Sequence, residues 1–251
     1  MVTIYKAPPT VQGQWVSAYN NERNLFMNPI ENLIPNMPQE TIEAFKENLD
    51  FSKRLMTYYS CALLEIETKF NVLNRQFSLE QEHNPIDTIK TRLKSPESIL
   101  EKMKRKNLPL NIESVEANLN DVAGVRVICP FIKDIYLLAD CLLEQDDVWL
   151  LERKDYIKHP KPNGYRSLHL IVETPIFLKN EKRMMKVEVQ LRTIAMDFWA
   201  NLEHRMRYKK NLSPELTQML AKDLKDCAES SAALDIKMEQ IKDLIEENAQ
   251  S

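Results

Sequence analysis

Two carboxylates stand where metal-assisted phosphate chemistry can take place. Asp121 directly precedes the strand-like run Val122–Cys129, and Glu188 lies on the polar face of a second strand-like run, Lys186–Thr193. Magnesium prefers one or two carboxylates together with phosphate oxygens of a substrate. Two carboxylates on separate strands of one sheet can converge on such an ion, so the pair predicts a magnesium site. The alternative for Asp121 is an ordinary turn residue before a strand.

Positive charge is concentrated between residues 86 and 106, where seven side chains are basic and three are acidic. The basic residues are Lys90, Arg92, Lys94, Lys102, Lys104, Arg105 and Lys106. Lys and Arg are natural ligands of phosphate, and Arg can also stack on a base. Taken alone, such a cluster more often forms a solvated basic helix face. In a protein whose net charge is -3, it favours a confined anion site over a broad nucleic-acid surface.

A turn at Asn163-Gly164 carries an unusual set of side chains. Asn-Gly between two strands is a strong hairpin signal, so a plain turn is the simplest interpretation. Yet Tyr165 is surrounded in sequence by cationic or titratable side chains, namely Lys158, Lys161, Arg166 and His169. A tyrosine stacked on a base contributes roughly 1–3 kcal/mol, and the cations can hold a polyphosphate. The loop therefore favours nucleotide binding.

The chain contains only three glycines, Gly13, Gly124 and Gly164. A P-loop needs two glycines around a phosphate-cradling turn, and a dinucleotide-binding fold or a protein-kinase lid needs three close together. None of these glycine patterns is present. Any phosphate in this protein must therefore be held by side chains.

The pattern of apolar residues predicts the elements that position these groups. An irregular, proline-rich extension over residues 1–40 precedes a long helix whose buried stripe is Leu55, Tyr58, Ala62, Ile66, Phe70, Leu73 and Phe77. A basic helix with an early break at Pro96 runs to about Lys106. Strands at 122–129, 148–157, 167–174 and 186–193 then alternate with a helix at 132–143 and are followed by a helix at 194–209. Interleaved strands and helices predict an α+β or α/β core with a mixed sheet.

The two last helices present apolar stripes. Residues 194–209 are expected to bury Ile194, Phe198, Leu202 and Met206. Ser213-Pro214-Glu215 is a helix start with proline in the first turn. The seam Leu220, Leu224, Cys227, Ser231, Leu234, Met238, Ile241 and Ile245 follows at alternating steps of four and three, as in a coiled coil. The helix either packs on its own domain or contacts another subunit.

Composition sets the compartment that we expect. Cys61, Cys129, Cys141 and Cys227 form no CxxC pair and lie among apolar neighbours, which indicates buried thiols in a reducing compartment. No run approaches the roughly 20 apolar residues that span a bilayer. The N-terminus lacks a basic region followed by an apolar core, so no signal peptide is expected. A cytoplasmic protein without a membrane partner is predicted.

Three stretches resemble one known family. DVAGVRVIC, KDYIKHPKPNGYRSLHL and VEVQLRTIAMDFWANLEH, in that order, are similar to the synthetase domain of RelA/SpoT homologues. The whole resembles a stand-alone small alarmone synthetase, nearer the RelP type than the RelQ type. The resemblance covers about residues 50–245. It implies a nucleotidyltransferase-like α+β fold, a mixed sheet flanked by helices, for the synthetase domain at 41–212, with an oligomerising helix at 213–251.

The resemblance also implies an activity and the residues that perform it. The family transfers the pyrophosphate of ATP to the 3′-hydroxyl of GDP or GTP, with Mg²⁺ as cofactor. By motif, the expected ATP-binding residues are Arg92, Lys94, Lys102 and Arg126, with the two arginines around adenine. Asp121 and Glu188 are the expected metal and catalytic carboxylates, Glu188 as metal ligand or general base. Lys161, Asn163, Tyr165, His169 and Gln190 are expected at the GDP or GTP.

Further expectations concern partners and alternatives. The resemblance implies a homotetramer formed through the C-terminal helix. No adjacent His-Asp pair of the family's hydrolase domain is present, so synthesis without hydrolysis is expected. A catalytically silent nucleotide sensor and an RNA-binding regulator remain alternatives, although the overall acidity disfavours RNA as the main ligand. The choice between GDP and GTP stays open.

Overall fold

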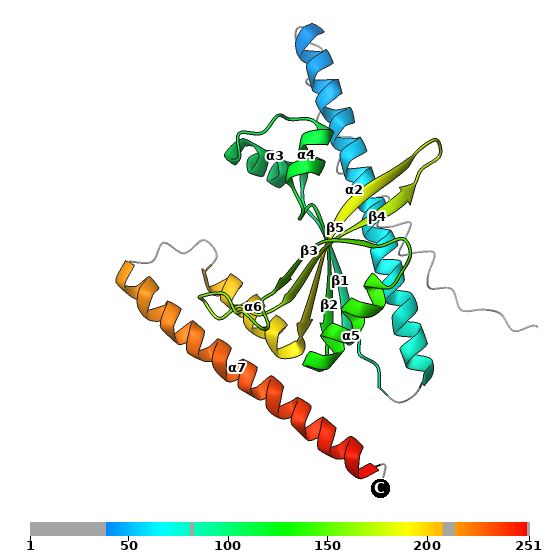
Figure 1. Cartoon of the computed structure of the whole chain (residues 1–251). Helices are drawn as coiled ribbons and strands as arrows, with labels where there is room; N and C mark the ends of the chain where they lie inside the picture. Colours follow the sequence, from blue (N-terminus) through cyan, green and yellow to red (C-terminus); the bar gives the residue numbers. More distant parts are fainter. Residues whose placement is uncertain (1–38, 81–82, 208–213, 250–251) are drawn as a thin grey trace, which may run out of the picture. The chain divides into compact units, whose positions relative to one another are not determined.

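The structure is a computed structural model that describes residues 39–80, 83–207 and 214–249. Its elements are α2 (Gln39–Glu80), β1 (Thr88–Leu93), α3 (Pro96–Arg105), α4 (Ile112–Asn118), β2 (Ala123–Cys129), α5 (Ile132–Leu143), β3 (Trp149–Asp155), β4 (Leu168–Phe177), β5 (Lys182–Thr193), α6 (Ile194–Arg207) and α7 (Pro214–Ala249) (Figure 1). The chain divides into two compact units at residue 51, and the second unit holds the whole sheet. The extension predicted for residues 1–40 lies outside the described residues except for its last two, which begin α2.

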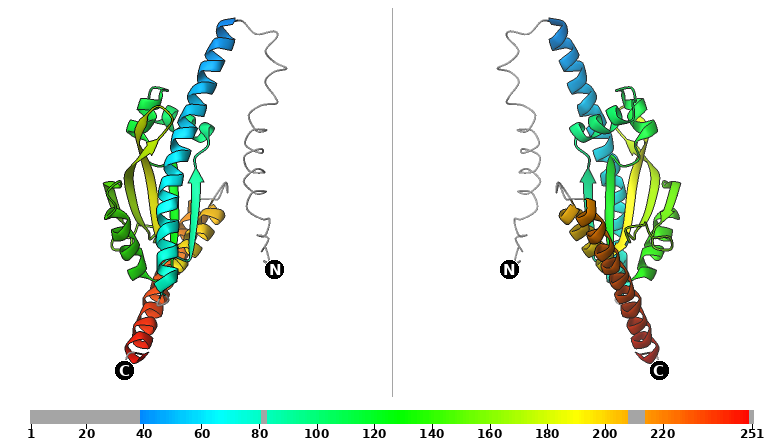
Figure 2. Two further views of the ribbon diagram at one scale, coloured as in Figure 1. Left: turned by 90° about the vertical axis from the view of Figure 1, so that its right-hand side faces the viewer. Right: turned by 90° about the vertical axis from the view of Figure 1, so that its left-hand side faces the viewer.

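Five strands form one mixed sheet in the order β1-β2-β5-β4-β3. β2 and β5 run parallel, whereas the other neighbours are antiparallel. Within the second unit, α5 and the part of α2 from residue 52 onward lie on one face of the sheet and α6 lies on the other, as the views in Figures 1 and 2 show. The α+β architecture with a mixed sheet and flanking helices, expected from the sequence, is confirmed.

The sheet face beneath α2 and α5 forms the core. Strand residues alternate between faces, and the residues turned to this side are buried: Val125, Val127, Cys129, Leu168, Leu170, Val172, Val187, Val189 and Leu191. The helix stripe on α2 is also buried, but it runs through Tyr59 and not through the predicted Tyr58. Tyr58 is half-buried, with the Arg183 guanidinium 4.7 Å from its ring centre.

The segment before α3 differs from its prediction. A single basic helix was expected as far as Lys106, but Thr88–Leu93 forms the edge strand β1, antiparallel to β2. The helix starts at Pro96 after Ser95, whose hydroxyl accepts a hydrogen bond from the Ser98 amide at 3.3 Å. Proline is favoured in the first helical turn because its missing N–H has no intrahelical partner there. Pro96 therefore begins a helix and does not break one.

Helix α6 buries a different stripe from the predicted one. Ile194 is 52% exposed and Phe198 is 64% exposed, and Leu202 and Met206 are exposed as well. The buried apolar side chains of this helix are instead Met196, Trp199 and Ala200. An apolar residue every three or four positions identifies a stripe, but α6 carries two stripes, and the sequence does not say which one faces the sheet.

Helix α7 begins at Pro214 as predicted, while the expected cap at Ser213 lies outside the described residues. It packs on α6: the Trp199 indole donates to the Leu224 carbonyl at 2.9 Å, and Ala228 is buried beside Trp199. The C-terminal half of the predicted seam does not take part in this packing. Leu234, Met238, Ile241 and Ile245 are between 42% and 64% exposed.

Candidate active site

The polar face of the sheet brings the predicted residues together through strand register. Two rows of directly paired residues cross it, one of Lys90, Arg126, Gln190 and His169 and the other of Arg92, Gly124 and Glu188. Residues that pair directly project from the same face of a sheet. The rows therefore gather side chains from β1, β2, β5 and β4 on the face that also carries α6.

All members of these rows except His169 line a pocket of about 610 Å³. Its lining is Lys90, Thr91, Arg92, Lys94, Asp121, Gly124, Val125, Arg126, Glu188 and Gln190. Six of the predicted site residues thus line one pocket, and Lys102 joins them through Asp121. Tyr165, His169, Lys161 and Asn163 do not line this pocket, but Tyr165 and His169 are linked to it by hydrogen bonds.

Two lysines form hydrogen bonds with the Asp121 carboxylate, just before the start of β2. The Lys94 ammonium donates to one carboxylate oxygen at 2.6 Å and the Lys102 ammonium donates to the other at 2.7 Å. Lys94 follows β1 and Lys102 lies on α3, so the unexpected strand and the short helix together aim both cations at one carboxylate. Burial alone would raise the pKa of Asp121, but the two lysines outweigh it and hold the pKa below its ordinary value.

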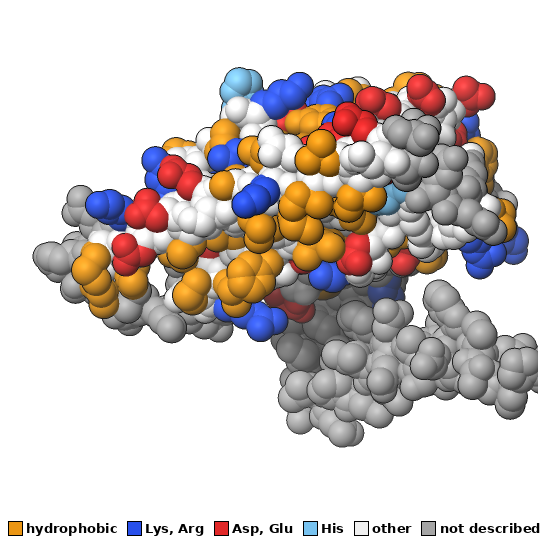
Figure 3. Space-filling view, turned by 90° about the horizontal axis from the view of Figure 1, so that it is seen from below, with side chains coloured by type: hydrophobic (Ala, Val, Ile, Leu, Met, Phe, Trp, Pro, Cys, Tyr) orange, Lys and Arg blue, Asp and Glu red, His pale blue; other side chains and the backbone are white. Residues whose placement is uncertain are grey.

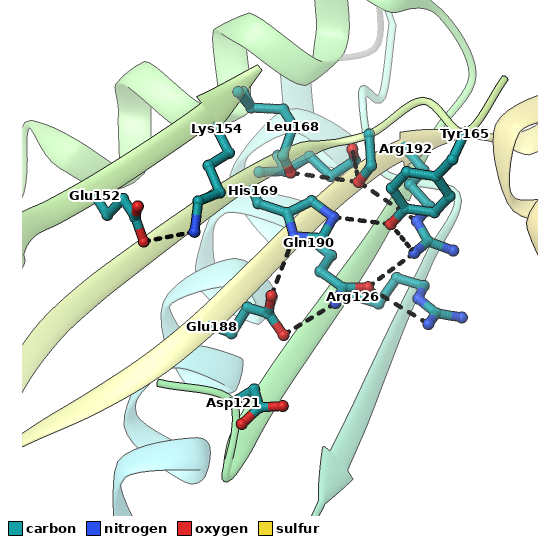
Figure 4. Close-up of polar contacts among 12 residues, drawn as sticks. Asp121, Arg126, Glu152, Lys154, Tyr165, Leu168, His169, Glu188, Gln190 and Arg192 are labelled. Carbon is teal, nitrogen blue, oxygen red and sulfur yellow. Dashed lines mark hydrogen bonds and ion pairs between the residues drawn. The ribbon is translucent and has the colours of Figure 1, made fainter. Parts of the chain in front are cut away.

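Glu188 is hydrogen-bonded to one side chain of the neighbouring strand β4 and to one of its own strand β5. One carboxylate oxygen lies 3.1 Å from His169 Nδ1, and the other accepts a bond from the Gln190 amide at 3.0 Å (Figure 4). Burial acts to raise the pKa of Glu188, yet the bonds from His169 and Gln190 bring it below its ordinary value. Both candidate catalytic carboxylates are therefore ionised at neutral pH.

The hydrogen bonds continue from Glu188 to the aromatic side chain of the loop. The Tyr165 hydroxyl lies 2.8 Å from His169 Nε2 and accepts a bond from Arg192 Nη2 at 2.5 Å. Arg192 Nη2 also donates to Gln190 Oε1 at 3.0 Å, and Arg126 Nη2 approaches the same oxygen at 3.4 Å (Figure 4). Tyr165 and Arg126, expected at different nucleotides, are thus ends of one polar network.

The turn that carries Tyr165 rests on the two last helices. Gly164 has a φ of +88°, a conformation that other residues rarely adopt. A Cβ added there would lie 2.5 Å from the Ala228 Cβ of α7. Tyr165 packs against the small cluster of Trp199 and Ala228, and the Lys161 ammonium sits 4.8 Å from the centre of its ring. The Asn163 amide approaches Glu203 of α6 at 3.4 Å.

The donor set fits a magnesium ion. Asp121 and Glu188 line the same pocket, and the charge of Asp121 is among the causes that raise the pKa of Glu188, so the two carboxylates interact. Among the described residues there is no group of three or more His, Cys, Asp or Glu side chains that could hold an ion unaided. Phosphate oxygens of a substrate would complete the coordination, as is usual for magnesium. Asp121 and Glu188 would hold the ion, and Lys94 and Lys102 would give up their bonds to Asp121.

Sequence reasoning missed one residue of the site, Asp197 on the first turn of α6. Its carboxylate accepts bonds from Lys90, Arg126 and Arg192. The signal was weak, because a single acid between Met196 and Phe198 in an apolar helix does not show which strands it will face. Arg192 was noted only as part of a motif, and it proves to be buried, at 4% exposure.

Comparisons with known proteins agree with this geometry. A family model described as "Region found in RelA / SpoT proteins" matches residues 91–213. The GTP pyrophosphokinase YwaC of Bacillus subtilis strain 168 is 45% identical over 190 residues, which cover 76% of this chain and 90% of the relative.

Solved structures show the same similarity. Small alarmone synthetase 2 of B. subtilis superposes with a TM-score of 0.68 at 45% identity, covering 76% of this chain and 97% of that one. Small alarmone synthetase 1 of B. subtilis bound to its product pppGpp gives a TM-score of 0.69 at 32% identity, with coverage of 77% and 97%. With matched motifs, fold and relatives in agreement, the chain belongs to the RelA/SpoT family.

Proposed function

We propose that the pocket transfers the β,γ-pyrophosphate of ATP to the 3′-hydroxyl of GDP or GTP, giving ppGpp or pppGpp and AMP. The observation that carries this proposal is the gathering of two ionised carboxylates, two lysines and two arginines around one pocket on the sheet face. The GTP pyrophosphokinase named among the relatives and the pppGpp-bound structural neighbour support the same reaction.

The donor nucleotide belongs on the side of β1 and β2. Arg92 and Arg126 line the pocket from these neighbouring strands, and guanidinium planes stack well on aromatic rings. We assign adenine to the space between them. Lys94 and Lys102 would move from Asp121 to the donor phosphates as ATP binds, so that each positive charge exchanges one anionic partner for another.

The acceptor nucleotide belongs on the side of β4 and the turn before it. We assign guanine to the ring of Tyr165, with Lys161, Asn163 and His169 around it. Gln190 lies between the two nucleotides because it pairs in register with both Arg126 and His169. This arrangement points the acceptor ribose towards Glu188, whose carboxylate is bonded to His169.

For this reaction the protein must position the two nucleotides and neutralise charge on the phosphates. Magnesium, when bound at Asp121 and Glu188, would neutralise charge on the donor phosphates. The bond between the 3′-oxygen and the β-phosphorus forms while the bond from that phosphorus to the α,β-bridging oxygen breaks, and AMP leaves with that oxygen. Glu188 accepts the hydroxyl proton, and its lowered pKa keeps it ionised and ready for this step.

We also propose that the protein acts as a homo-oligomer formed through α7, a tetramer as the family resemblance implies. The exposed seam on α7 continues into an apolar groove of about 830 Å³ lined by Phe131, Ile194, Phe198, Leu234 and Met238 among others. Hydrophobic side chains form several clusters on this underside of the molecule (Figure 3).

In the part of the chain that the structure describes, no helix is long and apolar enough to cross a membrane. We place the protein in the cytoplasm with its nucleotide substrates.

Nucleotide chromatography tests the activity. The full chain mixed with Mg²⁺, ATP and either GDP or GTP is expected to produce AMP together with ppGpp or pppGpp. The variants Asp121→Asn and Glu188→Gln are expected to lose synthesis while keeping the wild-type circular dichroism spectrum and unfolding midpoint. Near-normal synthesis by either variant would contradict the assignment of the carboxylates. Saturable nucleotide binding without turnover by the wild type would select the alternative, a nucleotide sensor.

A further inference from the structure

Asp197 gathers three cations that come from three different strands. One carboxylate oxygen accepts bonds from Arg126 Nη1 at 3.2 Å and from Arg192 Nη1 at 3.3 Å. The other accepts from the Lys90 ammonium at 3.1 Å and from the Asn201 amide at 2.9 Å. The residue is 6% exposed. Four donors therefore converge on a carboxylate that solvent hardly reaches.

The cations would repel one another without this carboxylate. Burial and the nearby charge of Arg192 both act to lower the pKa of Arg126, while Asp197 acts to raise it. For Asp197 itself, burial acts to raise the pKa, but Lys90 and Arg126 bring it below its ordinary value. A charged Asp197 thus compensates a pair of neighbouring, partly desolvated arginines.

Arg126 depends on Asp197 for its position because its other anchor is weak. Its second contact among the described residues, to Gln190 Oε1, is 3.4 Å long, and its Nε is buried without a partner in that part of the chain. Arg126 lines the pocket, whereas Asp197 is absent from the lining. Asp197 can reach a bound nucleotide only through the cations that it holds.

We infer that Asp197 is a positioning residue that fixes the Arg126 guanidinium at the donor pocket and thereby sets the affinity for ATP. The inference rests on the proposed function, because it takes Arg126 as the contact to adenine. The competing explanation is a purely structural role: an acid in the first turn of a helix is stabilised by the helix dipole, and Asn201 is bonded to it within the same helix. The two explanations differ in whether ATP affinity responds, and through which residue.

A double-mutant cycle on the full chain separates them. The dissociation constant of ATP with Mg²⁺ is measured by calorimetry for the wild type, Asp197→Asn, Arg126→Ala and the double variant. Asp197→Asn keeps the shape of the side chain and removes its charge, so ATP is expected to bind about tenfold more weakly. In the Arg126→Ala background the same change is expected to shift the dissociation constant by less than about twofold, because the residue through which Asp197 acts is gone.

Two controls accompany the cycle. Glu116→Gln breaks another carboxylate–arginine pair, to Arg183 at 2.8 and 2.9 Å, whose members do not line the pocket. It is expected to lower the unfolding midpoint without changing ATP affinity. Should Asp197→Asn fail to fold, Asp197→Glu keeps the charge and displaces it by one methylene. Asp197→Glu is expected to raise the dissociation constant of ATP several-fold while the unfolding midpoint stays the same. In the Arg126→Ala background it is expected to leave the dissociation constant of ATP unchanged.

Each outcome decides between the explanations. The inference is overturned if a folded Asp197 variant binds ATP as tightly as the wild type does. It is also overturned if the Asp197 substitution weakens ATP binding by the same factor with and without Arg126. Wild-type ATP affinity in Arg126→Ala would overturn the donor-site assignment, and the inference with it. Weakened binding in Arg126→Ala alone would leave the proposed function standing and remove only the role of Asp197.

Discussion

Arg192, Tyr165, His169 and Glu188 form a chain of hydrogen bonds beside the pocket. A guanidinium only donates, so the Tyr165 oxygen accepts from Arg192, and the same hydroxyl is hydrogen-bonded to His169 Nε2. The ionised Glu188 carboxylate only accepts, so His169 Nδ1 carries the proton of the bond between them. The tyrosine hydroxyl therefore helps to orient the carboxylate through the histidine, in addition to any stacking by its ring.

Two substitutions of Tyr165 separate these two contributions. Tyr165→Ala removes the ring and with it the stacking, which is worth about 1–3 kcal/mol. The affinity for GDP should therefore fall by roughly one to two orders of magnitude. Tyr165→Phe keeps the ring and removes the hydroxyl, so GDP affinity should hold while kcat falls because His169 loses an anchor. Calorimetry with GDP and steady-state kinetics measure the two effects. Unchanged GDP affinity in Tyr165→Ala would count against stacking.

Residue types, together with the family resemblance, predicted most of the residues that line the pocket. Asp121, Arg126, Glu188 and Gln190 were identified from sequence, and the pocket contains all of them. Their convergence could not be predicted, because it depends on the register between strands that are distant in the sequence. Asp197 was missed for the same reason: its partners are Lys90 and the two arginines, which other elements bring to it.

At the scale of elements, the turn that carries Tyr165 packs directly against α7. Gly164 fits closely against α7, and Trp199 of α6 bonds to the backbone of α7 at Leu224. The turn that carries Tyr165 is therefore seated on a helix that contributes nothing to the pocket lining. A change in the position of α7 would therefore move Tyr165, where we propose that guanine binds.

Gly164→Ala tests this connection. The new Cβ would meet Ala228 at 2.5 Å in a backbone conformation with φ of +88°, which alone costs about 1–2 kcal/mol. We expect an unfolding midpoint lowered by several degrees and weaker GDP binding, with ATP binding affected less. Gly124→Ala is the matched control for stability, because its Cβ would make only ordinary contacts, at 3.7 Å and beyond. Equal midpoints for the two variants would disprove the close fit at Gly164.

The elements also show where apolar spacing stops being informative. β1 was predicted as part of a helix because Ile89 and Leu93 are four residues apart and lysines are common in both states. Only its pairing with β2 selects the strand. On α6, the predicted stripe through Ile194 and Phe198 is real as a pattern but lies on the surface of the single chain. The core takes the second stripe, around Trp199.

At the scale of the whole molecule, the two surface stripes become one feature. The exposed stripe of α6 and the exposed seam of α7 meet in the apolar groove, where Phe198 and Leu234 are both lining residues. Monomeric proteins rarely leave large contiguous apolar surfaces uncovered. The α7 seam keeps the coiled-coil spacing of four and three into the C-terminal half of the helix, where its residues from Leu234 onward stay exposed. The contacts of α7 with its own domain are made by the N-terminal half of the seam, through Leu224 and Ser231, and by the neighbouring Ala228 and Asp235.

Leu234→Glu tests whether a second copy of the chain covers this surface. A charge placed in a desolvated seam is strongly unfavourable, so the mass measured by light scattering should fall to that of a smaller species, and Ile241→Glu should act in the same way. Ile236→Glu is the matched control, because Ile236 is as exposed as Leu234, at 50% against 56%, but lies outside the seam, and its mass should equal that of the wild type. An unchanged mass for Leu234→Glu and Ile241→Glu would mean that the seam serves the single chain alone. If the smaller species forms, its affinities for GDP and ATP should also be measured. The turn that carries Tyr165 packs on α7 through Gly164, so an α7 released from its partner should hold Tyr165 less firmly. The affinity for GDP should then fall more than the affinity for ATP.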